Sequence, residues 1–182
     1  MRTLVLGGIR SGKSRWAEGA ITEALPAGQP VCYLAPGPTG SGDADWAHRV
    51  AEHRNRRPAH WSTVESHDVA TQLRNSPDTP TLVDDLGSWL TGTLDRHDGW
   101  DGGSVSSPVR ETIEAMLAAV SDFPSTLVLV SPEVGLAVVP ATASGRRFAD
   151  ELGSLNQRVA QLCDRVVLVV AGQAVPIKPP GT

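Results

Sequence analysis

The residues with the clearest chemical meaning form one short pattern near the start of the chain. The stretch GGIRSGKS fits G-x-x-x-x-G-K-[ST] and lies between an apolar run and a helical pattern, which is the context that this phosphate-binding motif requires. Its glycines let backbone N–H groups turn towards phosphate oxygens, and the helix that follows points its positive dipole end at the anion. The residues expected to bind nucleotide here are Gly7, Gly8, Ile9, Arg10, Ser11, Gly12, Lys13 and Ser14.

Two side chains of this loop have specific roles in the hypothesis. Lys13 supplies a positive charge for the β- and γ-phosphates, and Ser14 supplies a hydroxyl ligand for Mg²⁺. The alternative is a strand-to-helix turn that contains a lysine by chance.

Carboxylates follow two other predicted strands. Asp84 and Asp85 end the run that begins at Thr81, and Glu133 follows the run that ends at Ser131. Ligands bind outside the carboxyl ends of parallel strands, so these acids are candidates to hold Mg²⁺ through its water shell. For the Asp pair the alternative is a solvated turn or a helix cap, and a structural role is equally open for Glu133.

A second signal is a histidine among arginines in the predicted helix 43–56. His53 shares one helix face with Trp46, Val50 and Arg57, because these residues recur at i, i+4, i+7 and i+11. Arg49, Arg54, Arg56 and Arg57 lie within nine residues of this acidic protein, which favours an anion site. The alternatives are a histidine satisfied in the core and a solvated basic face. His48, His60, His67 and His97 show no metal-ligand spacing and are expected to be surface or structural residues.

Elements of alternating type must position these residues. Strands are predicted at 3–6, 31–35, 61–65, 81–84, 126–130, 166–170 and 175–178, and helices at 13–25, 43–56, 66–74, 86–94, 108–120 and 145–163. Loops are expected at 36–42, 131–145 and 96–107, the last being the best candidate for a mobile loop. The pattern predicts one α/β domain over 1–182, a P-loop NTPase-like three-layer sandwich. Its sheet of about seven strands is mostly parallel, with an antiparallel C-terminal edge strand that contains Pro176.

Composition excludes several classes of protein. The 182 residues carry a net charge of −4 with 40% apolar and 20% charged residues, which argues against overall disorder and against a nucleic-acid binder. No apolar run reaches the roughly 20 residues of a membrane span, and the N-terminus lacks a signal-peptide layout. Cys32 and Cys163 lie in apolar settings and are expected to be unpaired core residues of a cytoplasmic protein.

A resemblance to a known family covers nearly the whole chain. GGIRSGKSRWAE resembles the family's GG-x-RSGKS opening with its Ala-Glu pair, and DADWAHRVAEHRNRRP at 43–58 resembles D-x-E-M-x-x-R-I-x-x-H-x-x-x-R-P. Further similar stretches lie at 33–35, 61–65, 84–91, 133–140 and 148–164. On these motifs the chain resembles the bifunctional adenosylcobinamide kinase / adenosylcobinamide-phosphate guanylyltransferase family of cobalamin biosynthesis.

The resemblance implies two successive reactions in one P-loop fold. ATP or GTP phosphorylates adenosylcobinamide, and GMP from GTP then passes through a histidine to adenosylcobinamide phosphate with release of pyrophosphate. By motif match the guanylylated histidine is His53. The chemistry of the P-loop predicts Mg²⁺ held at Ser14 and Asp84. The resemblance also implies a homotrimer with its active site near a subunit boundary. The other nucleotide-binding residues that it carries over are Tyr33, Leu34, Ala35, Arg54, Asn55, Arg56, Arg57, Glu65 and Asp84.

The chain departs from the family pattern at Pro36, Asp85, Pro132 and Ala137, and these changes leave the P-loop and His53 intact. Two other functions remain as alternatives. One is a P-loop kinase for another small metabolite, in which His53 is structural. The other is a nucleotide-gated binding module without catalysis.

Overall fold

The structure is a computed structural model that describes residues 1–37, 57–100 and 106–179. In chain order the described elements are β1 (Arg2–Gly7), α1 (Lys13–Glu23), β2 (Cys32–Ala35), β3 (Ser62–Glu65), α3 (Val69–Asn75), β4 (Thr81–Asp84), α4 (Leu86–Arg96), α5 (Ser107–Asp122), β5 (Leu127–Pro132), α6 (Ala143–Leu162), β6 (Arg165–Val170) and β7 (Gln173–Lys178). The predicted helix 43–56 and most of loop 36–42 lie outside the described residues.

The strands form one sheet in the order β3-β2-β4-β5-β1-β6-β7. All neighbours pair in parallel except β6 and β7, which pair antiparallel. The predicted α/β architecture is therefore confirmed, including the edge position of the strand that contains Pro176. Proline is tolerated there because an edge strand has one side without a ladder partner.

The central strands are apolar on both faces because both faces are covered. Along β5, Leu127 and Leu129 point into one core while Val128 and Val130 point into the other. All four are at most 2% exposed. This is the pattern of a parallel sheet between two helical layers, and it explains why these runs lack the alternation of half-exposed strands.

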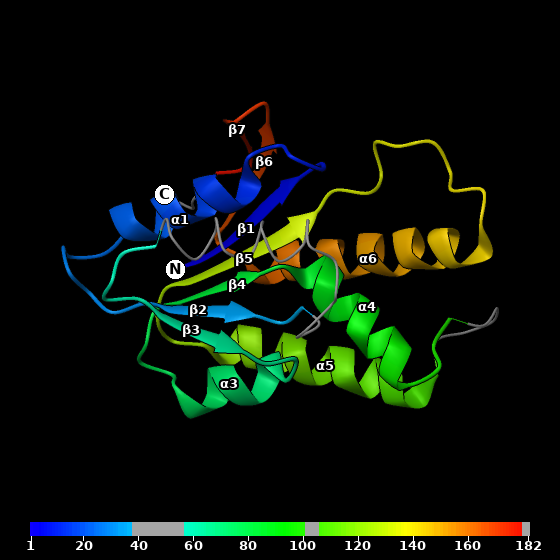
Figure 1. Cartoon of the computed structure of the whole chain (residues 1–182), viewed down its shortest axis with the longest axis horizontal. Coiled ribbons are helices and arrows are strands. Elements are labelled where there is room, and N and C mark those ends of the chain that lie inside the picture. Colours follow the sequence, from blue (N-terminus) through cyan, green and yellow to red (C-terminus); the bar gives the residue numbers. More distant parts are fainter. Residues whose placement is uncertain (38–56, 101–105, 180–182) are drawn as a thin grey trace.

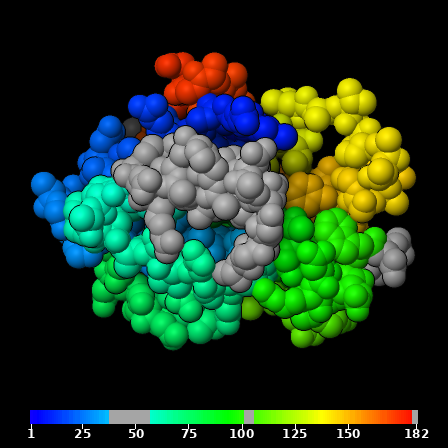
Figure 2. Space-filling model, viewed as in Figure 1, coloured from blue at the N-terminus to red at the C-terminus, as the bar shows by residue number. Residues whose placement is uncertain are grey.

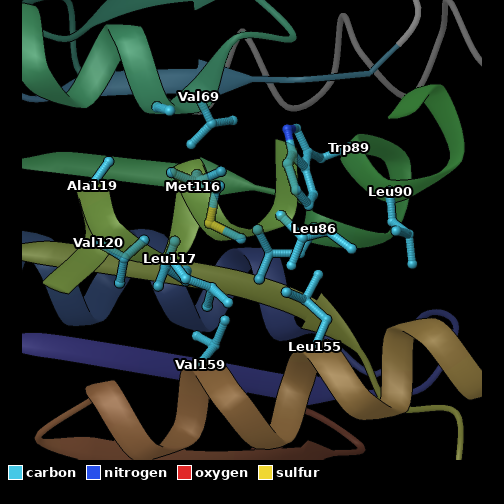
Figure 3. Packing of buried hydrophobic residues seen from close by; sticks show 14 of the residues in the cluster. Val69, Leu86, Trp89, Leu90, Met116, Leu117, Ala119, Val120, Leu155 and Val159 are labelled. Carbon is cyan, nitrogen blue, oxygen red and sulfur yellow. The ribbon is translucent and has the colours of Figure 1, made fainter. Parts of the chain in front are cut away.

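The two layers differ in extent. Figure 1 shows α1 on one side of the sheet and α3 and α5 on the other. The helices α3, α4, α5 and α6 build the larger core. Figure 3 shows four of its residues, Trp89, Met116, Leu155 and Val159. Trp89 is 1% exposed and donates its indole N–H to the His67 carbonyl at 3.1 Å, so its polar edge is satisfied inside the core.

Several element boundaries differ from the predicted ones for local reasons. Helix α3 begins at Val69 because Asp68 caps it, its carboxylate accepting from the Thr71 N–H at 3.0 Å. Helix α6 begins at Ala143, where Thr142 accepts from the Gly145 N–H at 3.1 Å. Strand β7 begins at Gln173, because Ala171 and Gly172, with φ of 50° and 77°, turn the chain within two residues.

The two cysteines are free thiols, as predicted. Cys163 is buried and burial raises its pKa to about 12, while burial also raises the pKa of the half-buried Cys32. Both are therefore unreactive core groups rather than nucleophiles. None of the helices in the described part of the chain has the length and hydrophobicity needed to cross a lipid bilayer.

Truncating the centre of the sheet should cost far more stability than truncating its edge. Leu129→Ala removes a side chain with 0% exposure and should lower the free energy of unfolding by about 2–5 kcal/mol, because the cavity collapses only partly. Val175→Ala, at a position 48% exposed on β7, is the control and should change it by about 0.5 kcal/mol or less. Urea denaturation measures both, and equal losses would contradict the burial assignment.

Candidate nucleotide site at the carboxyl edge of the sheet

The predicted phosphate loop connects β1 directly to α1. Gly7 is the last residue of β1, and Gly12 is the N-cap of α1 with a φ of 91°. Arg10 also has a positive φ, of 57°, and the Ser11 N–H donates to the Gly8 carbonyl at 3.3 Å. The loop therefore folds back over the first turn of α1, whose free N–H groups and dipole favour an anion.

Crowding requires glycine at Gly7. A Cβ there would lie 2.8 Å from the Val169 carbonyl oxygen and would collide with the Ser11 hydroxyl. A Cβ on Gly12 would lie 3.2 Å from the Cα of Gly172. The Gly172 N–H donates to the Ser11 carbonyl at 2.8 Å, so the β6–β7 turn supports the loop from behind.

Two polar side chains of the loop have defined surroundings. The Lys13 ammonium donates to the Gly8 carbonyl at 3.3 Å, which keeps the charge over the loop. The Ser11 hydroxyl is buried and has no hydrogen-bond partner among the described residues. Buried hydroxyls are normally paired, so this oxygen is an exception within the loop.

Asp84 is held by a neighbouring strand. The Tyr33 hydroxyl donates to Asp84 Oδ2 at 2.6 Å, while Tyr33 itself is 3% exposed. Burial and then the Asp84 charge raise the pKa of Tyr33 far above its ordinary value, so the phenol stays a donor at all working pH values. The short hydrogen bond orients the carboxylate at the carboxyl end of β4.

Arg57 lies over the aromatic ring of Tyr33. Its guanidinium carbon lies 3.2 Å from the centroid of the Tyr33 ring, and Nη1 donates to Thr63 Oγ1 at 2.8 Å. Asp84, Tyr33 and Arg57 thus form a chain of contacts from β4 to the first described residue after position 56.

The remaining predicted residues on β2 and β3 have different surroundings. Leu34 is 0% exposed and belongs to the larger core, so its side chain packs against apolar neighbours. Ala35 ends β2 and pairs with Glu65 at the end of β3, which puts both at the same edge as Asp84. His53, Arg54, Asn55 and Arg56 lie outside the described residues.

The other two candidate carboxylates are used locally. Asp85 is the N-cap of α4 and accepts from the Ser88 N–H at 2.7 Å, so the helix-cap alternative is right for this member of the pair. Glu133 accepts from the N–H groups of Gly135 and Leu136 at 2.7 and 3.0 Å. Its own N–H donates to the Gly7 carbonyl at 3.0 Å, which ties this loop to the P-loop.

His67 has a more specific place than the sequence indicated. Its ring lies against Trp89 at a centroid distance of 6.4 Å, and Nδ1 donates to the Pro36 carbonyl at 2.7 Å. Nε2 lies 3.3 Å from Thr93 Oγ1. A Cβ on Gly92 would collide with the ring, so that glycine makes room for it. No sequence signal marks this packing, because its partners come from segments more than 20 positions away.

Sequence reasoning also missed a groove beside the P-loop. It has a volume of about 660 Å³ and its lining includes Arg10, Arg15, Trp16 and Arg165. The Arg165 guanidinium lies 5.1 Å from the centroid of the Trp16 ring. Arg165 begins β6, so only the sheet topology brings it to α1.

The predicted Mg²⁺ ligands are two oxygen groups, the Ser14 hydroxyl and the Asp84 carboxylate, rather than a cluster of acids. Among the described residues no group of three or more His, Cys, Asp or Glu side chains could hold a metal ion. A hydroxyl at Ser14 and a carboxylate at Asp84 instead suit Mg²⁺, which keeps several of its waters and takes few protein ligands.

The loop, the helix that follows it and the acid on a neighbouring strand define a P-loop nucleotide-binding protein. Two solved structures of type III secretion ATPases have the same fold. The structure of a prototypical ATPase of such a system matches with a TM-score of 0.54 at 11% identity. The match extends over 96% of this chain and 56% of the ATPase chain. EscN of enteropathogenic E. coli matches with a TM-score of 0.56 at 10% identity, over 93% of this chain and 43% of the EscN chain. This chain thus spans about half of either ATPase, and the likeness concerns the fold alone.

Sequence comparison gives the family. The sequence model of the cobinamide kinase / cobinamide phosphate guanyltransferase family matches residues 3–177. Bifunctional adenosylcobalamin biosynthesis protein CobP of Pseudomonas aeruginosa is 42% identical over 98% of both chains. Protein CobU of Salmonella typhimurium, described in the same words, is 36% identical over 98% of this chain and 100% of its own. The chain belongs to the cobinamide kinase / cobinamide phosphate guanyltransferase family.

The crowding at Gly7 can be tested against its neighbour. Gly7→Ala should lower the free energy of unfolding by about 1–3 kcal/mol, because the new methyl group forces the P-loop away from Val169. Gly8→Ala is the matched control, since its Cβ would meet no atom within 4 Å. Urea denaturation of both variants decides, and an equal loss at both positions would contradict the packing described.

The environment of His67 predicts a component of the pH dependence of stability. Burial lowers its pKa from 6.5, opposed by the hydrogen bond to Pro36 and assisted by the nearby Arg96 charge. Between the lowered value and 6.5 the unfolded chain therefore binds more protons than the folded protein. The free energy of unfolding should fall as the pH falls through this window, and the contribution is complete above about pH 7.

The variant His67→Gln should lack this component. Urea denaturation at a series of pH values from 5 to 8 gives the slope for each protein. Wild-type protein should lose more stability than the variant on acidification, and parallel curves would show that His67 does not titrate in this way.

Proposed function

We propose that this protein is a bifunctional adenosylcobinamide kinase and adenosylcobinamide-phosphate guanylyltransferase. The observation that carries the proposal is the P-loop geometry within a chain whose family match spans residues 3–177. The first reaction moves the γ-phosphoryl group of ATP or GTP to the hydroxyl of adenosylcobinamide. The second moves GMP from GTP to the resulting phosphate, which gives adenosylcobinamide-GDP and pyrophosphate.

In the kinase reaction the P-loop holds the donor nucleotide. The substrate hydroxyl oxygen attacks the γ-phosphorus, the bond to the β–γ bridging oxygen breaks, and the hydroxyl proton is released to solvent. The N–H groups of residues 8–14 and the Lys13 ammonium face the charge that builds on the phosphates. Ser14 and Asp84 would hold Mg²⁺, which neutralises charge on the phosphate chain when bound.

In the guanylyl transfer His53 is the nucleophile. A neutral imidazole nitrogen attacks the α-phosphorus of GTP, a P–N bond forms, and the bond to the leaving pyrophosphate breaks. A phosphate oxygen of adenosylcobinamide phosphate then attacks the same phosphorus and the P–N bond breaks, which regenerates the imidazole. At an ordinary pKa of about 6.5, roughly three quarters of a histidine is neutral at pH 7. The covalent intermediate divides one difficult transfer into two easier ones.

Cationic and polar side chains after the histidine assist this transfer. We assign nucleotide contacts to Arg54, Asn55, Arg56 and Arg57, and to Glu65 at the end of β3. The position of Arg57 over Tyr33, which in turn bonds Asp84, supports a charge link between this segment and the metal-binding acid. Arginine suits the role because its planar donors match phosphate oxygens.

Three of the four residues that depart from the family pattern have defined structural places. Asp85 caps α4, and Pro36 accepts the hydrogen bond from His67. The Pro132 carbonyl accepts from the Asn156 side chain at 3.0 Å, and its ring would lie 2.8 Å from a Cβ on Gly87. Because these residues are accommodated without displacing the P-loop, we propose that both activities are retained.

The remaining assignments follow from the family. We propose that residues 1–182 form a single catalytic domain, which the match over residues 3–177 supports. The protein acts as a homotrimer in the cytoplasm, with adenosylcobinamide, its phosphate, ATP and GTP as partners and without nucleic acid.

Self-labelling with GTP tests the covalent step. Incubation with α-labelled GTP and Mg²⁺ should attach label to the protein in an acid-labile, alkali-stable bond, as expected of a phosphoramidate. His53→Ala should lose this label while keeping phosphorylation of adenosylcobinamide. Lys13→Ala should lose at least a hundredfold in both rates, because charge stabilisation at the phosphates supports both steps.

His60→Ala is the matched control, since His60 is exposed and lies seven positions further on. It should label like the wild type. A wild-type protein that phosphorylates adenosylcobinamide but takes no label would be a small-metabolite kinase. One that binds GTP without any turnover of cobinamide would be a nucleotide-gated binding module.

A further inference from the structure

The loop between β5 and α6, residues 133–142, exposes aliphatic side chains. Leu136, Val138 and Val139 are 81%, 92% and 73% exposed. From Val134 to Thr142 the loop contains no charged residue. Exposed apolar side chains that are grouped together on a protein surface are typical of a binding site.

The backbone of loop 133–142 is held at both ends. At its start the Glu133 carboxylate accepts from the N–H groups of Gly135 and Leu136. At its end the Arg146 guanidinium donates to the carbonyls of Pro140 and Ala141 at 3.0 and 2.8 Å. Figure 1 shows the loop, in yellow, standing out from the body of the molecule, and Figure 2 shows its side chains as a projecting rim. Hydrogen bonds thus fix the two ends of the loop from which these side chains project.

The position of loop 133–142 relates it to the phosphate site. The Glu133 N–H bonds the carbonyl of Gly7, the first residue of the P-loop motif. Leu136 lies three residues further on, so at about 3.5 Å per residue it is on the order of 15 Å or less from Gly7. A ligand that rests on the loop at Leu136 can therefore reach the P-loop through a side arm of at most about this length.

We propose that loop 133–142 binds the macrocycle of the corrinoid substrate through Leu136, Val138 and Val139. The inference rests on the proposed function. A corrinoid of this class is a large ring with methyl groups on its rim, and its reacting hydroxyl lies at the end of a flexible amide arm. Methyl groups of the ring cover the three aliphatic side chains, while the arm brings the hydroxyl to the P-loop.

The size of the surface favours a ring-shaped ligand over a second protein. A stable protein interface uses about 20–30 residues and about 800 Å² on each side, whereas loop 133–142 offers three large apolar side chains. At its far end the loop borders a hollow of about 490 Å³ whose lining includes Trp100, Thr142 and Phe148. Aromatic side chains with a few polar groups are usual in the lining of sites that bind organic ligands.

The test replaces the three side chains together, in the variant L136S/V138S/V139S. Adenosylcobinamide is titrated into the protein and binding is followed by its visible absorption or by equilibrium dialysis. The dissociation constant should rise about tenfold or more, since each lost apolar contact weakens binding severalfold. The dissociation constant for GTP and self-labelling by GTP should not change, because the loop holds the corrinoid and not the nucleotide.

The matched control is V175S/I177S on β7, where the two side chains are 48% and 59% exposed. It removes comparable apolar surface away from loop 133–142 and should leave corrinoid binding unchanged. A second variant, L136M/V138I/V139I, keeps the apolar character and should bind like the wild type.

Three results would overturn the inference. The first is an unchanged corrinoid dissociation constant in L136S/V138S/V139S. The second is an equal weakening in the β7 control. The third is a lower molecular mass of the loop variant by light scattering, which would assign the loop to a subunit contact. Since binding is measured without turnover, a wild-type protein that binds no adenosylcobinamide contradicts the proposed function itself, whereas equal binding by wild type and variant contradicts only the role of the loop.

Discussion

The phosphate-binding loop depends on close packing of the backbone of residues 7–12, which connects β1 to α1, against the end of β6 and the β6–β7 turn. The chain must leave β1 beside the Val169 carbonyl and re-enter a helix at Gly12, and it has no space for a side chain at Gly7. Because the β6–β7 turn donates a hydrogen bond into this loop, the last two strands contribute to the phosphate site although they carry none of its motif. A preformed loop of this kind spends little free energy on ordering when an anion binds.

A second constraint connects the strand ends around this loop. Tyr33 on β2 bonds Asp84 on β4 and lies under Arg57, which follows the segment that carries His53. Charged and polar groups from separate parts of the chain thereby share one low-dielectric layer, where each contact is stronger than it would be in water. The side chains at the carboxyl edge of the sheet therefore hold one another in place through direct contacts.

How much of the site was predictable differs from residue to residue. The P-loop could be found because its glycines, lysine and serine act within eight consecutive positions. Asp84 could be found as an acid after a strand, but its neighbour Asp85 looked equivalent and proved to cap a helix. Glu133 was placed at the correct edge, yet its carboxylate binds the backbone of its own loop. When two acids are neighbours in the sequence, their position predicts which edge of the sheet they reach. It does not predict the direction in which each side chain points.

The sequence by itself determined the order of strands and helices, the phosphate-binding loop and the family, because each of these is written in local patterns. Only the tertiary structure decided that Tyr33 supports Asp84 and that His67 holds Pro36. It also decided that Leu136, Val138 and Val139 face outwards on a loop that Glu133 ties to the P-loop. The physical reason is that these contacts join residues separated by tens of positions. The order of the strands in the sheet and the packing of α4 against the sheet decide which residues meet. The hydrophobic periodicity of a single segment predicts neither the strand order nor this packing.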